Sequence, residues 1–237
     1  MEFATELMLR LAEILPTGFL GFTCEASPGL SGSAQMVISS EHEGGIPLLI
    51  EDKPRLQLQV DYYLIVSPNS TRATVVRSTF LVRPYGIGRP LFSVDYVRDA
   101  HSNTPAAHYN FHFEHGPVEQ ELLTAGAVRR GKLHRRAAEG GKGARLADLH
   151  FPVGGHRFRP CLEDVIEMLW IEFGIDVKQT AKAAINEGRE TWRSMQAKAA
   201  VADDPSSAVD ELRALGFTVV PPDGDLSTRR LDRIHAI

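Results

Sequence analysis

The sequence predicts an α+β fold: an N-terminal helix, then an antiparallel β-sheet meander, then a helical C-terminal third. Three observations lead to this fold class. Hydrophobic residues recur at helical spacing over residues 3–15, alternate with polar residues over much of 18–115, and return to helical spacing after residue 161. Strands that precede helices, rather than alternating with them, favour an antiparallel sheet with helices on one face or at one end.

The first helix is expected over residues 3–15, because Pro16 cannot continue a helix. Its apolar residues share one side: Phe3, Leu7, Met8, Leu11, Ile14 and Leu15. A helix with one apolar stripe buries it against another element, so we expect this helix to pack on another part of the protein.

The clearest strand runs from Arg55 to Val66, where every second residue is apolar. A period of two with one polar face indicates a strand with one buried side. The turn-forming residues at 67–70 lead to a second strand over 73–82, so the two runs predict an antiparallel pair. Further strands are expected at 91–97 and 107–114, with weaker candidates at 18–26 and 34–39.

The C-terminal third is expected to contain three helices. The first covers 162–173 and stops at Gly174; Asp176 caps the second, which continues to about Ala200; the third begins at Pro205 and closes at Gly216. The second helix would bury Val177, Ala181, Ala184, Ile185, Trp192 and Met195. A short strand is expected at 217–220.

Residues 149–159 predict a tight hairpin, because two apolar-alternating arms flank Gly154-Gly155. In that hairpin Val153 pairs with His156, and His150, Arg157 and Arg159 share one face. We therefore expect residues 1–160 to form a helix and sheet, with a basic loop at 126–146 and the hairpin at 149–159. Residues 161–237 would pack on the sheet within the same domain.

Composition excludes several classes of protein. The 237 residues are 43% hydrophobic with a net charge of −4, which is typical of a globular chain. There is no apolar run of about 18–20 residues for a membrane helix and no basic leader. Cys24 and Cys161 are too few for a disulfide framework or a cysteine zinc site. We expect a soluble cytoplasmic protein without a membrane partner. No common nucleotide-binding motif is present, and no cofactor is expected.

Positive charge is concentrated in one segment. Residues 126–160 carry nine lysine or arginine residues against two acidic ones, whereas the flanking segments are acidic. Five glycines lie between Gly126 and Gly143, so we expect a mobile loop. Such a loop attracts phosphate backbones or acidic proteins, unless it is solvated or held against the protein's own acidic flanks. The expected nucleic-acid contacts are Arg129, Arg130, Lys132, Arg135 and Arg136.

Six of the nine histidines lie at 101–115 and 150–156. One interpretation is a metal-independent nuclease, since imidazoles serve as acid and base and guanidiniums bind phosphate. Its catalytic group would be His112, Glu114, His150, Arg157 and Arg159. The same strand allows a metal site formed by His112, Glu114 and His150, although ligand geometry leaves it underdetermined. The third interpretation is that these histidines are hydrogen-bonded polar groups on a strand face.

Cys161 follows Pro160 at the start of a helix, where the helix dipole and nearby cations lower a thiol pKa. The run from His150 to Pro152, followed by Cys161, resembles the ubiquitin-conjugating (E2) family, in which a His-Pro-Asn tripeptide precedes the thioester cysteine. That resemblance implies a Cys161-dependent thiol enzyme. The alternative is a buried cysteine that fills a gap in the core.

The leading hypothesis is a polyanion-binding or interaction module. It would bind RNA, DNA or an acidic protein through the basic loop and a His/Arg-rich sheet surface. The ribonuclease-like enzyme and the E2-like enzyme remain alternatives, so enzymatic activity is left open.

Overall fold

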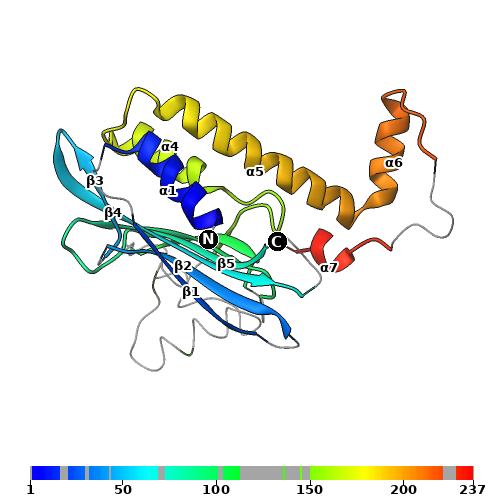
Figure 1. The fold of residues 1–237 in the computed structure, drawn as a ribbon, viewed down its shortest axis with the longest axis horizontal. Helices are drawn as coiled ribbons and strands as arrows, with labels where there is room; N and C mark the ends of the chain where they lie inside the picture. The colour runs from blue at the N-terminus through cyan, green and yellow to red at the C-terminus, as the bar shows by residue number, and fades with distance from the viewer. Residues whose placement is uncertain are drawn as a thin grey trace.

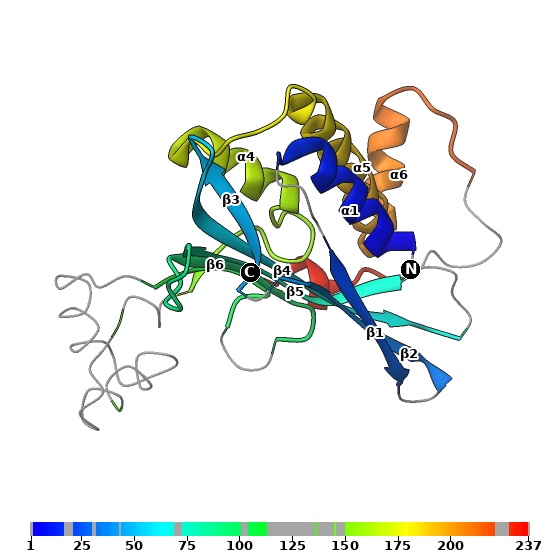
Figure 2. The same cartoon turned by 60° about the vertical axis from the view of Figure 1, so that its left-hand side comes forward.

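The α+β prediction is confirmed by the computed structural model, which describes residues 2–16, 21–29, 32–42, 44–68, 73–100, 104–112, 136, 145, 150–220 and 228–236. Figure 1 shows three helices over one face of an antiparallel sheet: α1 (Glu2–Ile14), α4 (Leu162–Phe173) and α5 (Ala181–Asp203). The view in Figure 2 shows α1 beside α5 above the strands. None of the described helices is long and apolar enough to span a bilayer.

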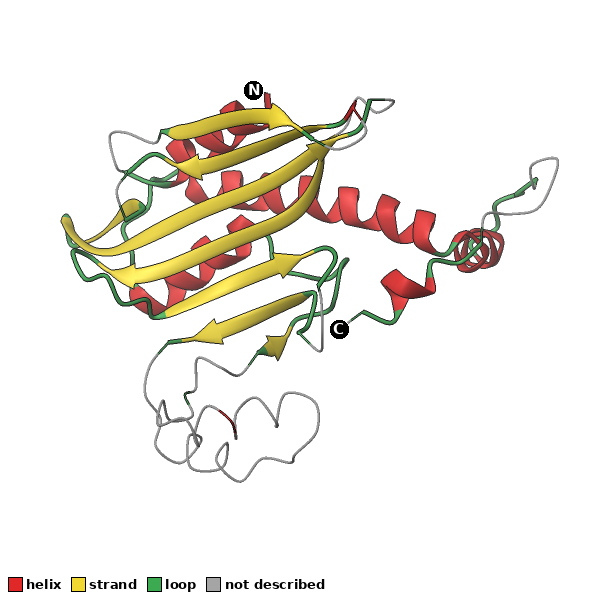
Figure 3. Ribbon diagram, turned by 90° about the horizontal axis from the view of Figure 1, so that it is seen from below, coloured by secondary structure: helices red, strands yellow, loops and turns green. Residues whose placement is uncertain are grey.

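Within the described part of the chain the sheet has eight strands, all paired antiparallel: β1 (Phe22–Pro28), β2 (Ala34–Ser40), β3 (Ile46–Ile50), β4 (Lys53–Val66), β5 (Ala73–Pro84), β6 (Phe92–Val97), β7 (Ala107–Phe111) and β8 (Phe151–Pro152). The strand order is β1-β2-β4-β5-β6-β7-β8, and β3 also pairs with β4. Strands β2 and β3 contact different halves of β4, which is the longest strand. Figure 3 shows the sheet from the side opposite α1, α4 and α5.

Alternation along the strands gives the sheet two chemically different faces. In β6, Phe92 and Val94 are buried in the core with the helices, so Ser93 and Asp95 lie on the opposite face. We call these the helix face and the outer face. The register aligns β7 with β6, so that Tyr109 and Phe111 are on the helix face whereas His108 and Asn110 are on the outer face.

One apolar core joins the helices to the sheet. It contains Leu11 of α1, Ile166 of α4 and Ile185 of α5 together with inward side chains of β2 to β6. Helix α5 packs against the core through small residues, which include Ala181, Ala184 and Gly188. A Cβ at Gly188 would meet the Glu163 carboxylate and the Arg10 guanidinium, so a larger residue there would require these two side-chain ends to move.

The connection between α4 and α5 differs from the expectation. Helix α4 ends at Gly174 in the left-handed conformation, as predicted, but α5 begins at Ala181 rather than after Asp176. The Asp176 carboxylate instead accepts hydrogen bonds from the backbone N–H groups of Glu51 (3.2 Å) and Asp52 (2.8 Å). These two residues form the β3–β4 turn with φ values of 52° and 59°, so a carboxylate distant in sequence stabilises a turn without glycine.

The predicted hairpin at 149–159 is wrong within its described residues, 150–159. Only Phe151–Pro152 is extended, and it pairs with β7, whose edge supplies free backbone groups. Val153 N–H still bonds the Ala107 carbonyl, but Gly154 and Gly155, with φ of 66° and 60°, then turn the chain towards the helix face. His156 and Arg159 become buried there instead of pairing across a hairpin.

Two other differences concern short elements. The strand expected at 217–220 is absent from the described residues there; Phe217 and Val220 are exposed in irregular chain that follows α6 (Pro205–Ala214). Strand β3 and the short helix α7 (Leu231–Ile234) were not predicted from the sequence.

Asp176→Ala is expected to lower the free energy of unfolding by about 1–2 kcal/mol, because the left-handed β3–β4 turn loses two hydrogen-bond acceptors. Urea titration measures the change. Asp210→Ala, which removes an exposed carboxylate from α6, is the matched control and should leave stability unchanged. Equal stability of Asp176→Ala and the wild type would contradict this role.

Candidate functional site

The sheet separates the residues that were expected to form a nuclease site. His150 lies on the outer face, its ring 4.5 Å from that of His108. His112 follows Phe111, a helix-face residue, and so turns to the outer face as well. Arg159 lies on the helix face, against the ring of Tyr96. The expected convergence of His112 and His150 with the arginines is therefore wrong.

Five of the other predicted site residues lie outside the described residues: Glu114, Arg129, Arg130, Lys132 and Arg135. Arg136 is described, and its side chain is exposed. The described residues contain no group of three His, Cys, Asp or Glu side chains placed to hold a metal ion.

The outer face carries a hydrogen-bonded network centred on Asp95. Its carboxylate accepts hydrogen bonds from the Thr79 hydroxyl (2.8 Å), the Ser93 hydroxyl (2.6 Å) and the Asn110 amide (2.8 Å). These donors come from β5, β6 and β7, so the network ties three strands together. Burial lowers the pKa of nearby His112, an effect that the charge of Asp95 opposes.

On the helix face, the chain after β8 buries His156 within a group of arginines. Its Nε2 lies 3.3 Å from Arg233 and its Nδ1 lies 3.2 Å from the Tyr96 hydroxyl. Since a guanidinium only donates, Nε2 is the acceptor and Nδ1 carries the proton. Burial, followed by the charges of Arg233, Arg157, Arg159 and Arg98, lowers the pKa of His156 to about 4. The imidazole is therefore neutral at pH 7.

Arg159 is a buried cation held between two aromatic rings. Its guanidinium carbon lies 3.7 Å from the ring centroid of Tyr96 and 4.7 Å from that of Trp192. It donates a hydrogen bond to the His156 carbonyl and is only 8% exposed. Burial lowers its pKa to about 10, so the side chain remains charged at neutral pH. Among the described residues, no carboxylate forms an ion pair with it.

Arg157 has a different environment, because it is neutralised by a carboxylate. Its Nε and Nη2 donate to the two oxygens of Asp203 at 2.6 and 3.1 Å. Asp203 is the last residue of α5, so this paired contact attaches the 153–160 loop to that helix.

A pocket of about 400 Å³ lies between this loop and α5. Its lining combines cationic, aromatic and small side chains: Arg157, Phe158, Arg159, Asp164, Trp192, Arg193, Gln196, Ala197 and Ala200. Phe158 is 82% exposed, and the Oε1 atom of Gln196 is buried without a hydrogen-bond partner. We call this the α5 pocket.

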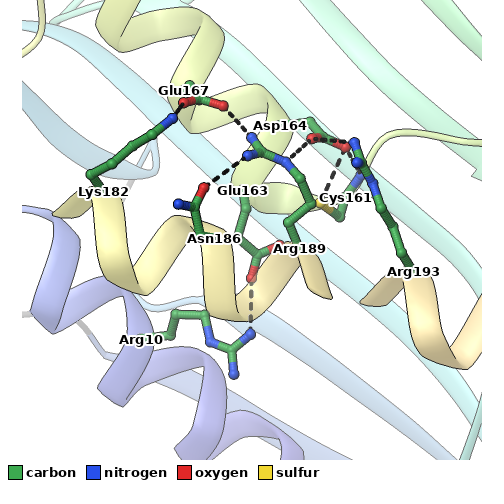
Figure 4. A network of polar contacts seen from close by, with 9 residues as sticks. All are labelled: Arg10, Cys161, Glu163, Asp164, Glu167, Lys182, Asn186, Arg189 and Arg193. Atoms are coloured by element: carbon green, nitrogen blue, oxygen red, sulfur yellow. Dashed lines mark hydrogen bonds and ion pairs between the residues drawn. The ribbon is translucent and has the colours of Figure 1, made fainter. Parts of the chain in front are cut away.

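Figure 4 shows the ion-pair network that positions the α5 pocket. Arg189 of α5 donates to Asp164 of α4 at 2.7 Å and also pairs with Glu167, which Lys182 contacts as well. These contacts hold α5 against α4, while Arg10 of α1 pairs with Glu163 at 3.2 Å. Trp192 and Arg193 lie in the next turn of α5 and are thereby placed beside Arg159.

Cys161 is part of this network. Its backbone N–H and its thiol both donate to Asp164 Oδ2, at 3.1 and 3.2 Å (Figure 4). Burial raises the pKa of the thiol far above its ordinary value, and the charges of Glu163 and Asp164 raise it further. The expectation of a lowered thiol pKa is therefore wrong, because burial and two carboxylates outweigh the helix N-terminus.

Arg157 and Arg159 were predicted as site residues from the sequence, whereas Trp192, Arg193 and Gln196 were not. Trp192 was assigned to a buried stripe that also included Met195, which is in fact 49% exposed. The sequence feature that could have indicated them is an aromatic residue, a cation and an amide at positions i, i+1 and i+4 of one helix, here Trp192, Arg193 and Gln196.

Comparisons with protein-family models, with curated proteins and with solved structures found no match for this chain.

The pKa of His156 predicts a pH-dependent stability. An unfolded histidine has a pKa near 6.5, so between about pH 6.5 and pH 4 the unfolded state binds a proton that the folded state does not. The contribution of His156 to the free energy of unfolding is therefore complete above pH 6.5 and is lost as the pH falls towards 4. We expect urea titrations to show a loss of roughly 1–3 kcal/mol from this residue between pH 7 and pH 4.5. His156→Gln should flatten the profile, whereas exposed His235→Gln should not; superimposable profiles would refute the assignment.

Thiol labelling separates the two cysteines. A mild alkylating reagent at pH 7.5 should modify exposed Cys24 and leave buried Cys161 unmodified until urea unfolds the protein. Mass spectrometry of Cys24→Ser measures Cys161 alone. Rapid labelling of this variant in its folded state would restore the thiol-enzyme hypothesis.

Proposed function

We propose that this protein binds nucleic acid at the α5 pocket and acts as a binding module rather than as a nuclease. The observation that carries the proposal is the buried guanidinium of Arg159, which faces a pocket and has no carboxylate partner among the described residues. A buried charge without a counter-charge is costly. A phosphate group in the pocket would provide that counter-charge, since guanidinium and phosphate form strong paired hydrogen bonds.

The charge balance of the pocket supports an anionic ligand. Arg159 and Arg193 line it together with the carboxylate of Asp164, whereas the third lining arginine, Arg157, is already neutralised by Asp203. Asp164 is already occupied by Arg189, by the Cys161 N–H and, at 3.8 Å, by Arg193. Arg98 and Arg233 add positive charge behind the loop, as the low pKa of His156 indicates.

Exposed aromatic surface distinguishes nucleic acid from other anions. Phe158 is 82% exposed at the pocket, and Trp192 forms part of its wall. An aromatic side chain next to arginines is the arrangement with which proteins stack bases while holding the backbone. A simple anion site would gain nothing from an exposed phenyl ring.

The basic segment at 126–146 extends the proposal along the chain. Its cations are Arg129, Arg130, Lys132, Arg135 and Arg136, and it precedes residues 150–160 in sequence. We propose that it supplies further phosphate contacts, which are independent of base sequence. An acidic protein would use the same charges but would not need Phe158.

The test is fluorescence anisotropy with a labelled 20-nucleotide RNA and DNA, each single-stranded and double-stranded, at several salt concentrations. Binding should weaken with salt. Arg193→Ala should reduce affinity about threefold to tenfold and lower the salt slope by about one. Lys198→Ala removes one charge from the same helix outside the pocket lining and is the matched control.

Failure of every nucleic acid to bind, or equal effects of Arg193→Ala and Lys198→Ala, would contradict the proposal. Gel analysis of the same mixtures, with and without chelator, should show intact strands. Cleavage that survives purification of the wild type but disappears in His112→Ala would favour the nuclease instead.

A further inference from the structure

We infer that the α5 pocket recognises an unpaired nucleotide, with its base inserted in the pocket and its phosphate on the arginines, so that the protein selects single-stranded over double-stranded nucleic acid. This inference rests on the proposed function and specifies its ligand. It depends on the size of the pocket, the placement of Phe158 and the state of Gln196.

The pocket has the dimensions of a small-molecule site rather than of a duplex groove. Its volume of about 400 Å³ lies within the range of pockets that enclose drug-sized ligands. A base in a duplex is stacked and paired, so it cannot enter such a recess, whereas an unstacked base in a single strand can. A duplex would offer the pocket only its phosphates.

The walls suit the two halves of a nucleotide. Phe158, Trp192, Ala197 and Ala200 present apolar surface, and Arg159 already covers one face of the Trp192 ring. The exposed Phe158 ring is therefore the available stacking surface for a base. Arg159 and Arg193 provide cations for the attached phosphate.

Gln196 adds an unsatisfied polar atom to a residue that lines the pocket. Its Oε1 atom is buried and has no hydrogen-bond partner, which costs free energy in the unliganded protein. Every nucleobase carries an N–H donor on its pairing edge, and that edge is free only when the base is unpaired. A rotation of the Gln196 side chain towards the pocket would let Oε1 accept a hydrogen bond from an inserted base, through the same N–H that a duplex uses for pairing.

If Gln196 binds a base, its substitution should affect binding and thermal stability in opposite directions. Gln196→Met removes the unpaired oxygen while keeping the side-chain length. We expect it to maintain or raise thermal stability and to weaken single-strand binding at least threefold. A merely structural glutamine would change stability and affinity in the same direction.

The deciding experiment is competition anisotropy against a labelled single-stranded 12-mer. The competitors are the unlabelled strand, its blunt duplex, the same strand with abasic sugars throughout, and inorganic phosphate. We expect the intact strand to compete at least tenfold better than the duplex and the abasic strand. Phe158→Ala and Gln196→Met should reduce this preference, while Lys198→Ala should retain it.

A spectroscopic readout locates the base. The chain has two tryptophans, so Trp170→Phe leaves Trp192 as the sole indole, and the intact strand should quench its fluorescence more than the abasic strand does. Equal competition by duplex or abasic strand, or equal quenching, would overturn the unpaired-nucleotide inference while the proposed function stands. Absence of binding by every nucleic acid would overturn both.

Discussion

The candidate site depends on how the guanidinium of Arg159 is held. Its neighbours come from three parts of the chain: Tyr96 from β6, Trp192 from α5 and the His156 carbonyl from the loop after β8. Contacts between a desolvated cation and an aromatic ring contribute about 2 kcal/mol each, whereas removing the charge from water costs several kcal/mol. The arrangement therefore persists because the surrounding core holds sheet, loop and helix in place. The positive charge of Arg159 is not neutralised by any described carboxylate, and a bound anion would neutralise it.

That core is in turn organised by the approach of α5 to α1 and α4. Gly188 leaves room for the ends of the Glu163 and Arg10 side chains; the Arg10–Glu163 pair links α1 to α4, and the Arg189–Asp164 pair links α5 to α4. Partly exposed ion pairs contribute little stability individually. Their importance here is geometric, because a rotated α5 would move Trp192 away from Arg159.

The sequence pattern predicted an element correctly where burial of one side of that element determines its structure. Strand β4 was found from its alternation because one of its faces is buried, while β3 was missed because its short apolar run includes Pro47 and does not alternate. Gly154-Gly155 correctly predicted a turn. The residues before it, however, pair with the edge of β7 and not with residues 156–159 as predicted. Arg157 and Arg159 were predicted as site residues, but their neighbours lie on α5, and no local pattern joins positions so distant in sequence.

The alternation within β6 has an evolutionary consequence. Asp95 anchors the outer-face network and Tyr96, the next residue, supports Arg159 on the helix face. A single codon inserted or deleted between Phe92 and Asp95 would exchange the environments of these two side chains, putting a carboxylate into the core and taking an aromatic ring out of it. Descendants of this gene should therefore tolerate substitution in β6 far better than any change in its length.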